Sequence, residues 1–270
     1  MKKLLLIAAV AAFASTAMAQ NTENGHEYVD LGLNSGLMWA TCNVGASSPG
    51  EAGLYLQWGE TEEVAQYDAN HYKYGTFDYN TYSNVFTKYV TKAAYGTVDN
   101  KEVLDAEDDA ATVLMGGSWR MPSLDDVNEL LANTTVKTEL IGSVTCYRFT
   151  SKNDTTQSIV LPRVGYKQNK TTTSGTAYYM TLNLSTTNNG MVPVLRVKAT
   201  GDPDVYTSAF RYYGMYVRGV CKPSPVTAVT DIKTTVDNPN APVYDLSGRV
   251  VKGELSQGIY IKNGKKFIVR

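Results

Sequence analysis

The chain has 270 residues, 43% of them hydrophobic, which is enough for one large domain with its own core and a small appendage. Its 25 basic and 26 acidic residues give a net charge of −1, without a basic block. Nucleic acids and anionic membrane surfaces are bound by clustered lysine and arginine. The balanced charge therefore argues against both classes of partner.

The N-terminus has the three parts of a secretory signal peptide. Two lysines follow Met1, residues 4–13 are apolar, and residues 17–19 place small side chains where a signal peptidase cleaves. We expect residues 1–19 to be removed, so that the exported chain begins near Gln20. No later apolar stretch approaches the ~20 residues of a membrane helix, so we expect no membrane insertion after cleavage.

The composition favours strands and turns. The 19 tyrosines and the many threonines suit half-buried strands, while asparagine and the 22 glycines suit turns. A hairpin is predicted first, with strands at 28–31 and 37–41 around a turn at 34–36. Residues 66–96 are rich in tyrosine but have no steady period. Because disordered segments are poor in aromatic residues, we expect a long ordered loop region there.

Two short helices are predicted in the middle of the chain. The first follows the acidic residues of 105–109, since acids complement the dipole at a helix start. The second covers 123–132, where Ser123 can cap the helix, Asp126 completes a capping box and an apolar stripe follows. Strands are then expected at 147–150, 158–161, 177–184, 193–197, 210–215 and 216–220.

Prolines mark a domain boundary after residue 222. Residues 223–242 have no apolar pattern and are expected to form a linker. Residues 243–270 form a compact β pattern, in which Asn263-Gly264 fits a type I′ turn between two strands. We therefore expect one domain over residues 20–222 and a small separate β unit after the linker.

Several motifs occur in a fixed order between residues 25 and 222. They are His26–Leu33 with Trp39–Ala46, Trp58–Thr61, Glu107–Ala111, Trp119–Ser123 and Tyr213–Cys221. In this order they resemble the Fibrobacter-type major paralogous domain that is common in Bacteroidetes. The resemblance implies an α+β domain with a C-type-lectin-like fold, which has two short helices, small antiparallel sheets and long loops.

The tail carries a second resemblance. Val243–Arg249 and Gly258–Ile261 are similar to the C-terminal sorting domains of Bacteroidetes secretion. This resemblance implies a contact with the secretion machinery and an address outside the cell or on its surface. If the tail is not an export signal, the expected address is the periplasm.

The three cysteines are an odd number for an oxidising compartment. At most one intramolecular disulfide can form among Cys42, Cys146 and Cys221. Because C-type-lectin-like folds bring their first and last strands together, the resemblance implies a Cys42–Cys221 disulfide. Cys146 would then be a free, buried thiol.

Catalytic signals are sparse. The two histidines, His26 and His71, lie in no recognisable nucleophile motif. Formylglycine-generating enzymes of similar fold bind copper through a close cysteine pair, whereas Cys221 has no partner a few residues away. The acids of Asp105–Asp109 could supply oxygen ligands for calcium, with a solvated helix start as the alternative. We therefore expect no catalytic residue, no metal and no cofactor.

The candidate ligand site is the loop side of the domain, because folds with a rigid base use their loops for recognition. Tyrosine and tryptophan rings offer flat apolar faces with a polar edge, which suits sugars and peptides. The candidate ligand-binding residues are Trp58, Tyr72, Tyr74, Tyr79 and Tyr82. These rings could instead only fasten the loop to the domain.

Three functions are consistent with the sequence. The first is an exported, non-catalytic binding or surface-structural protein that recognises a glycan or protein ligand. The second is a structural or adhesin-type surface component without a small ligand. The third is an enzyme related to the formylglycine-generating enzymes.

Overall fold

The structure is a computed structural model that describes residues 21–200, 202–223, 240–263 and 265–269. The chain divides into two compact units, Met1–Pro223 and Ser224–Arg270. The predicted signal peptide and most of the predicted linker lie outside the described residues. No helix in the described part of the chain is long and apolar enough to cross a membrane.

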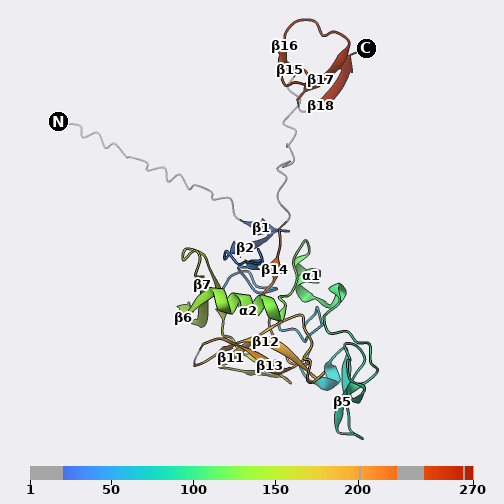
Figure 1. The fold of residues 1–270 in the computed structure, drawn as a ribbon, viewed down its shortest axis with the longest axis vertical. Helices are drawn as coiled ribbons and strands as arrows, with labels where there is room; N and C mark the ends of the chain where they lie inside the picture. The colour runs from blue at the N-terminus through green and yellow to red at the C-terminus, as the bar shows by residue number, and fades with distance from the viewer. Residues whose placement is uncertain (1–20, 201, 224–239, 264, 270) are drawn as a thin grey trace, which may run out of the picture. The chain divides into compact units, whose positions relative to one another are not determined.

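The larger unit begins and ends in one four-stranded antiparallel sheet with the order β1-β2-β3-β14 (Figure 1). Its strands are β1 (Thr22–Glu23), β2 (His26–Asp30), β3 (Met38–Ala40) and β14 (Val220–Cys221). The hairpin predicted at 28–41 is confirmed as β2 and β3. Trp39 of β3 pairs with Val220 of β14, so the two ends of the unit lie side by side.

Two further sheets follow, with the orders β6-β7-β8 and β11-β12-β13. They consist of β6 (Thr134–Ile141), β7 (Val144–Ser151), β8 (Ser158–Pro162), β11 (Thr176–Met180), β12 (Met191–Lys198) and β13 (Asp204–Phe210). Strands predicted at 147–150, 158–161 and 193–197 are confirmed within β7, β8 and β12. The strand predicted over 210–215 is wrong, because β13 ends at Phe210, whose carbonyl accepts a hydrogen bond from Tyr213 N in a turn (3.0 Å).

The β11-β12-β13 sheet separates two hydrophobic cores, because alternate residues of a strand point to opposite faces. Met180 and Val194 belong to one core, together with Trp58 and most of the buried rings of the loop region. Tyr179 and Leu195 belong to the other core, which α2 and the β6-β7-β8 sheet cover. Both faces of the central sheet are therefore buried.

Both α-helices are capped by side chains. They are α1 (Ala110–Met115), which follows the 3₁₀ helix η3 (Ala106–Asp108), and α2 (Leu124–Asn133). The predicted capping box of α2 is confirmed, since Ser123 and Asp126 exchange hydrogen bonds. The Asp109 carboxylate caps α1 by accepting from Ala111 N (2.9 Å) and Thr112 N (3.1 Å).

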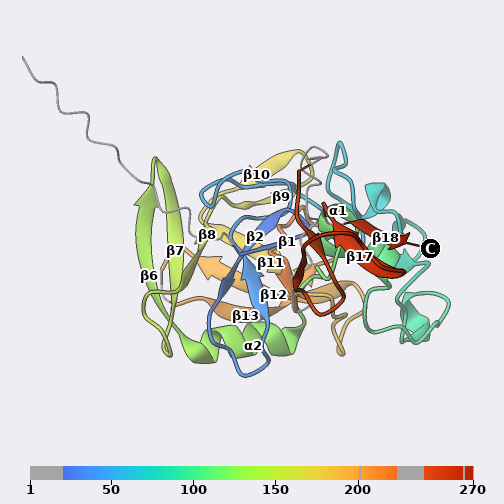
Figure 2. The same ribbon diagram turned by 90° about the horizontal axis from the view of Figure 1, so that it is seen from above.

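The segment 66–96 is ordered, as predicted, but it contains regular elements that the sequence did not indicate. They are η1 (Ala69–His71), β4 (Gly75–Asp78), β5 (Ser83–Phe86) and η2 (Ala93–Tyr95). A second small hairpin, β9 (Tyr166–Gln168) with β10 (Thr171–Thr173), meets this segment through a bridge between Tyr67 and Asn169. Figures 1 and 2 place the segment and the β6–β7 hairpin at opposite ends of the larger unit.

The smaller unit is a four-stranded antiparallel sheet with the order β16-β15-β17-β18. Its strands are β15 (Val243–Tyr244), β16 (Val250–Val251), β17 (Gly258–Lys262) and β18 (Lys265–Val269). The predicted tail hairpin is confirmed by the pairing of Lys262 with Lys265, and Asn263 has the positive φ (51°) of its turn. Asp245 stabilises another turn by accepting from Ser247 N.

Candidate functional site

The structure divides the five predicted ligand-binding rings into two groups. Trp58, Tyr72 and Tyr74 are 0%, 3% and 8% exposed and lie in the hydrophobic core, so they cannot contact a ligand at the surface. Tyr79 and Tyr82 are 66% and 81% exposed. For the first group, the alternative of loop packing is the one that the structure supports.

A buried arginine packs against two of those three rings, Trp58 and Tyr72. The guanidinium carbon of Arg211 lies 4.9 Å from the ring centre of Trp58 and 5.1 Å from that of Tyr72. Arg211 Nε donates to the Tyr72 hydroxyl (2.8 Å), which itself donates to the Trp58 carbonyl (2.7 Å). The other guanidinium nitrogens donate to backbone carbonyls of Lys88, Tyr89 and Asn189.

The positive charge of Arg211 is thus stabilised by aromatic rings, the Tyr72 hydroxyl and backbone carbonyls. No carboxylate is among its hydrogen-bond partners in the described residues. A buried cation of this kind needs many partners, because desolvation of an unpaired charge costs several kcal/mol. No motif in the sequence marks Arg211 as a buried residue. The available signal was an arginine placed between Phe210 and Tyr212 in an apolar stretch.

The acidic run at the start of α1 also has an internal cation. Lys88 Nζ lies 2.7 Å from Asp105, 3.2 Å from Glu107 and 2.6 Å from Asp108, the three carboxylates that come together in the structure. Burial raises the pKa of Asp108, but hydrogen bonds from Lys88 and from the Tyr74 and Tyr89 hydroxyls outweigh it and lower that pKa to about 2. The Lys88 ammonium therefore lies among the carboxylates that the sequence suggested as possible calcium ligands.

The exposed tyrosines lie on the β4–β5 hairpin around Phe77. The ring centres of Tyr79 and Tyr82 lie 5.0 Å and 6.2 Å from that of Phe77, both with edge-to-face geometry. Tyr79 borders a cleft of about 420 Å³, whereas Tyr82 does not. Tyr79 is therefore the better candidate for contact with a ligand in the cleft, and Tyr82 is not a lining residue.

The cleft beside Tyr79, called the polar cleft below, is rich in hydrogen-bonding groups. It is lined by the amides of Gln66, Asn70, Asn84, Gln168 and Asn169 and by the Asp68 carboxylate, with the rings of Phe77, Tyr79 and Tyr212 beside them. Three separate segments build it: the loop region, the β9–β10 hairpin and the turn after β13, which carries Tyr212. The sequence identified Tyr79 alone among these residues.

Hydrogen bonds fix the frame of the polar cleft. Asn70 donates to the Tyr79 hydroxyl (3.1 Å) and accepts from Phe77 N (3.1 Å). Burial raises the pKa of Asp68, but hydrogen bonds from His71 and Gln66 outweigh it, so the net pKa is lowered. Asp68 is therefore ionised at neutral pH.

One polar atom in the cleft has no partner. Asn84 Oδ1 is buried and accepts no hydrogen bond from the described residues. A buried acceptor without a partner costs ~1–3 kcal/mol. Because Asn84 Oδ1 is enclosed, a ligand donor reaches it only if the Asn84 side chain turns toward the cleft that this residue lines.

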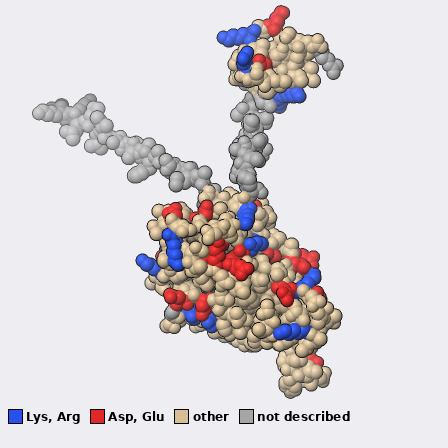
Figure 3. Space-filling model, viewed as in Figure 1, with Lys and Arg blue, Asp and Glu red and all other residues tan. Residues whose placement is uncertain are grey.

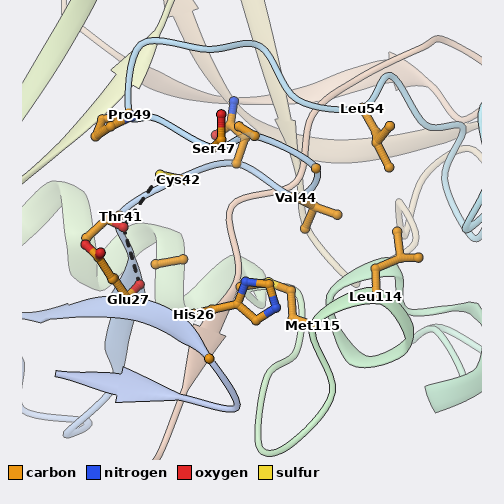
Figure 4. A pocket seen from close by; sticks show the side chains of 15 residues that line it. His26, Glu27, Thr41, Cys42, Val44, Ser47, Pro49, Leu54, Leu114 and Met115 are labelled. Atoms are coloured by element: carbon orange, nitrogen blue, oxygen red, sulfur yellow. Dashed lines mark hydrogen bonds between the residues drawn. The ribbon is translucent and has the colours of Figure 1, made fainter. Parts of the chain in front are cut away.

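A second hollow, called the apolar pocket below, lies between β2, the loop that follows β3, and α1 (Figure 4). Its volume is about 720 Å³. Val44, Leu54, Leu114 and Met115 give it apolar walls, and His26, Thr41 and the half-buried Cys42 lie at its polar side. The His26 ring is oriented edge-on toward Trp119, with 6.3 Å between the ring centres.

The disulfide that the resemblance implied is not formed, because Cys42, Cys146 and Cys221 are all free. Cys221 pairs with Met38 across the sheet, four residues before Cys42. Ala40 N and Val44 N donate to the carbonyls of Gly219 and Val217 (both 2.9 Å), so Cys42 lies beside residues 217–219 and not beside Cys221. Cys146 is a free, buried thiol, as expected.

The surface of the larger unit shows the near-equal numbers of acidic and basic residues that the sequence contains. In the view of Figure 3 acidic and basic side chains are interspersed over the visible face of this unit.

The chain matches no protein-family model, no curated protein and no solved structure. The polar cleft and the apolar pocket are therefore the features of the molecule that bear on its function.

Proposed function

We propose that the chain is an exported, non-catalytic binding module with a C-type-lectin-like fold, which binds a neutral, hydroxyl-rich ligand such as a glycan in the polar cleft. The observation that carries the proposal is the exposed Tyr79 ring beside a cleft that is lined by five side-chain amides. The order of the sequence motifs and the α+β architecture support the fold.

The lining suits sugar hydroxyls better than charged groups. Each hydroxyl both donates and accepts hydrogen bonds, and so does each side-chain amide. The lining residues include neither lysine nor arginine, and the Asp68 carboxylate disfavours an anionic ligand. An aromatic ring such as Tyr79 adds a flat apolar face against which a sugar ring packs.

The frame of the cleft is largely formed before a ligand binds. The Asn70 amide connects the Tyr79 hydroxyl with the β4 backbone, and the Tyr67–Asn169 bridge joins the two segments. Preformed sites lose less conformational entropy on binding. A ligand therefore meets oriented amides instead of ordering the loop itself.

The test is a glycan array probed with the chain that begins at Gln20, followed by calorimetry with the best ligand. We expect Tyr79→Ala to weaken binding roughly 5- to 150-fold, since truncating a contact anchor costs ~1–3 kcal/mol. Tyr82→Ala is the matched control, because Tyr82 is also exposed and contacts Phe77 but lies outside the cleft.

Asn84→Ala gives a second test, because the proposal predicts a loss of binding in a variant that keeps its fold. The Asn84 side chain also interacts with the Tyr212 hydroxyl, so the variant should lose no more than about 1 kcal/mol of unfolding free energy. Removing a ligand contact weakens binding. No binding to any glycan, or equal losses for the Tyr79 and Tyr82 variants, would favour the structural or adhesin-type alternative.

A further inference from the structure

We propose that the apolar pocket is a second binding site, separate from the polar cleft, for a neutral and mainly apolar small molecule that packs against Leu114 and lies beside the Cys42 thiol. Its volume of about 720 Å³ falls within the ~300–1,000 Å³ typical of small-molecule sites. The polar cleft is lined mainly by amides, whereas this pocket has aliphatic walls, with His26, Glu27 and Ser47 among the residues of its polar side. The two hollows therefore differ in ligand chemistry.

The apolar walls come from two separate elements. Val44 and Leu54 belong to the loop after β3, and Leu114 and Met115 belong to the last turn of α1. Leu114 is 41% exposed at the pocket, although Met115 beside it is 5% exposed. A leucine that remains exposed in a concave apolar surface gains contact area when a ligand packs against it.

The loop wall is fixed from behind by a buried arginine. Arg218 is fully buried and donates to the carbonyls of Ala40 (2.9 Å) and Thr41 (2.6 Å) and to Asn43 Oδ1 (2.9 Å). Because protein oxygen atoms accept these hydrogen bonds, the Arg218 guanidinium has its partners inside the protein. The same bonds hold the loop backbone in place. The pocket is therefore preformed, and its lining contains neither lysine nor arginine to attract an anion.

The polar side of the pocket retains hydrogen-bonding capacity. The Thr41 hydroxyl has one proton, and its two acceptors are distant, the Glu27 carbonyl at 3.5 Å and Cys42 Sγ at 3.6 Å (Figure 4). A ligand hydroxyl or carbonyl would compete well with bonds of this length. The expected ligand thus has an alkyl or aryl body and one neutral polar group.

Nile red, a neutral apolar dye, tests the site in the chain that begins at Gln20. We expect saturable binding with a blue-shifted emission. Leu114→Asp should weaken it at least tenfold, while Val113→Asp should leave it unchanged. Val113 is the matched control because it is 47% exposed on the same helix but does not line the pocket.

Cys42 gives an independent readout of the same pocket. It is the half-buried thiol, whereas Cys146 and Cys221 are buried. We expect N-ethylmaleimide to label Cys42 first and saturating Nile red to slow that labelling at least tenfold, as measured by peptide mass spectrometry. Absence of dye binding, equal losses in both aspartate variants, or unprotected Cys42 would overturn the proposal. Tyr79→Ala should not affect the dye, so failure here is distinguishable from failure of the glycan proposal.

Discussion

Replacing Lys88 by methionine should destabilise the larger unit, because this ammonium contacts three carboxylates at once. Asp108 is 2% exposed, and its pKa falls from an ordinary 3.8 to about 2. At ~1.4 kcal/mol for each tenfold change in the protonation equilibrium, ionised Asp108 contributes about 2 kcal/mol at neutral pH. Because its folded-state pKa is lowered, this contribution is present above pH ~4 and is lost as the pH falls toward 2.

We expect Lys88→Met to lower the free energy of unfolding by about 2–3 kcal/mol at pH 7, since the buried Asp108 carboxylate then keeps only the exposed Lys73 ammonium, 3.4 Å away, as a counter-ion. The measurement is urea unfolding followed by circular dichroism at pH 7 and pH 3. The loss should shrink at pH 3, because a buried Asp108 carboxylate without Lys88 is protonated there and no longer carries a poorly compensated charge.

Lys101→Met is the matched control for this experiment. Lys101 also binds an acid, Asp105, at 2.6 Å, but it is 44% exposed. Exposed pairs contribute ~0–1 kcal/mol, so its loss should stay below about 1 kcal/mol and depend little on pH. Equal losses for both variants, or a Lys88→Met loss that does not change with pH, would refute the role of Lys88 as the internal counter-ion.

Three further predictions concern other parts of the chain. Arg211→Met should lower the free energy of unfolding by about 3–5 kcal/mol in urea titrations, because the carbonyls and the Tyr72 hydroxyl that it holds lose their donor; a loss below about 1 kcal/mol would contradict this role. Non-reducing peptide mapping should find no Cys42–Cys221 crosslink. Deleting residues 243–270 should leave the melting temperature of the larger unit unchanged, since the chain divides at residue 223, and should block surface display if the tail is a sorting signal.

Local signals in the sequence predicted the elements that local interactions determine. The capping box of α2 involves residues three positions apart, and the tail hairpin depends on the turn at Asn263. The strand β13 was missed, and a strand was placed over 210–215 instead. Whether the chain turns after Phe210 depends on Arg211, whose partner Tyr72 lies 139 residues away. Pairings at that distance leave no periodic pattern in a single sequence.

The candidate site shows the same limit. Composition correctly marked residues 66–96 as an ordered aromatic region, but it could not say which rings face inward. The polar cleft needs the β9–β10 hairpin, which reaches the loop through the Tyr67–Asn169 bridge. Gln168 and Asn169 belong to an ordinary polar stretch of sequence, so nothing marked them as lining residues.

The buried rings and the exposed ring have linked roles. Trp58 and Tyr72 surround Arg211, and Tyr74 and Tyr89 hydroxyls donate to Asp108, which binds Lys88. These contacts order the start and end of a long segment whose middle carries the β4–β5 hairpin. Because the segment is already ordered in the folded chain, a ligand does not have to supply the conformational entropy of ordering it. In the proposed function, packing and recognition are complementary uses of the same aromatic segment, and Tyr79 is its exposed ring beside the polar cleft.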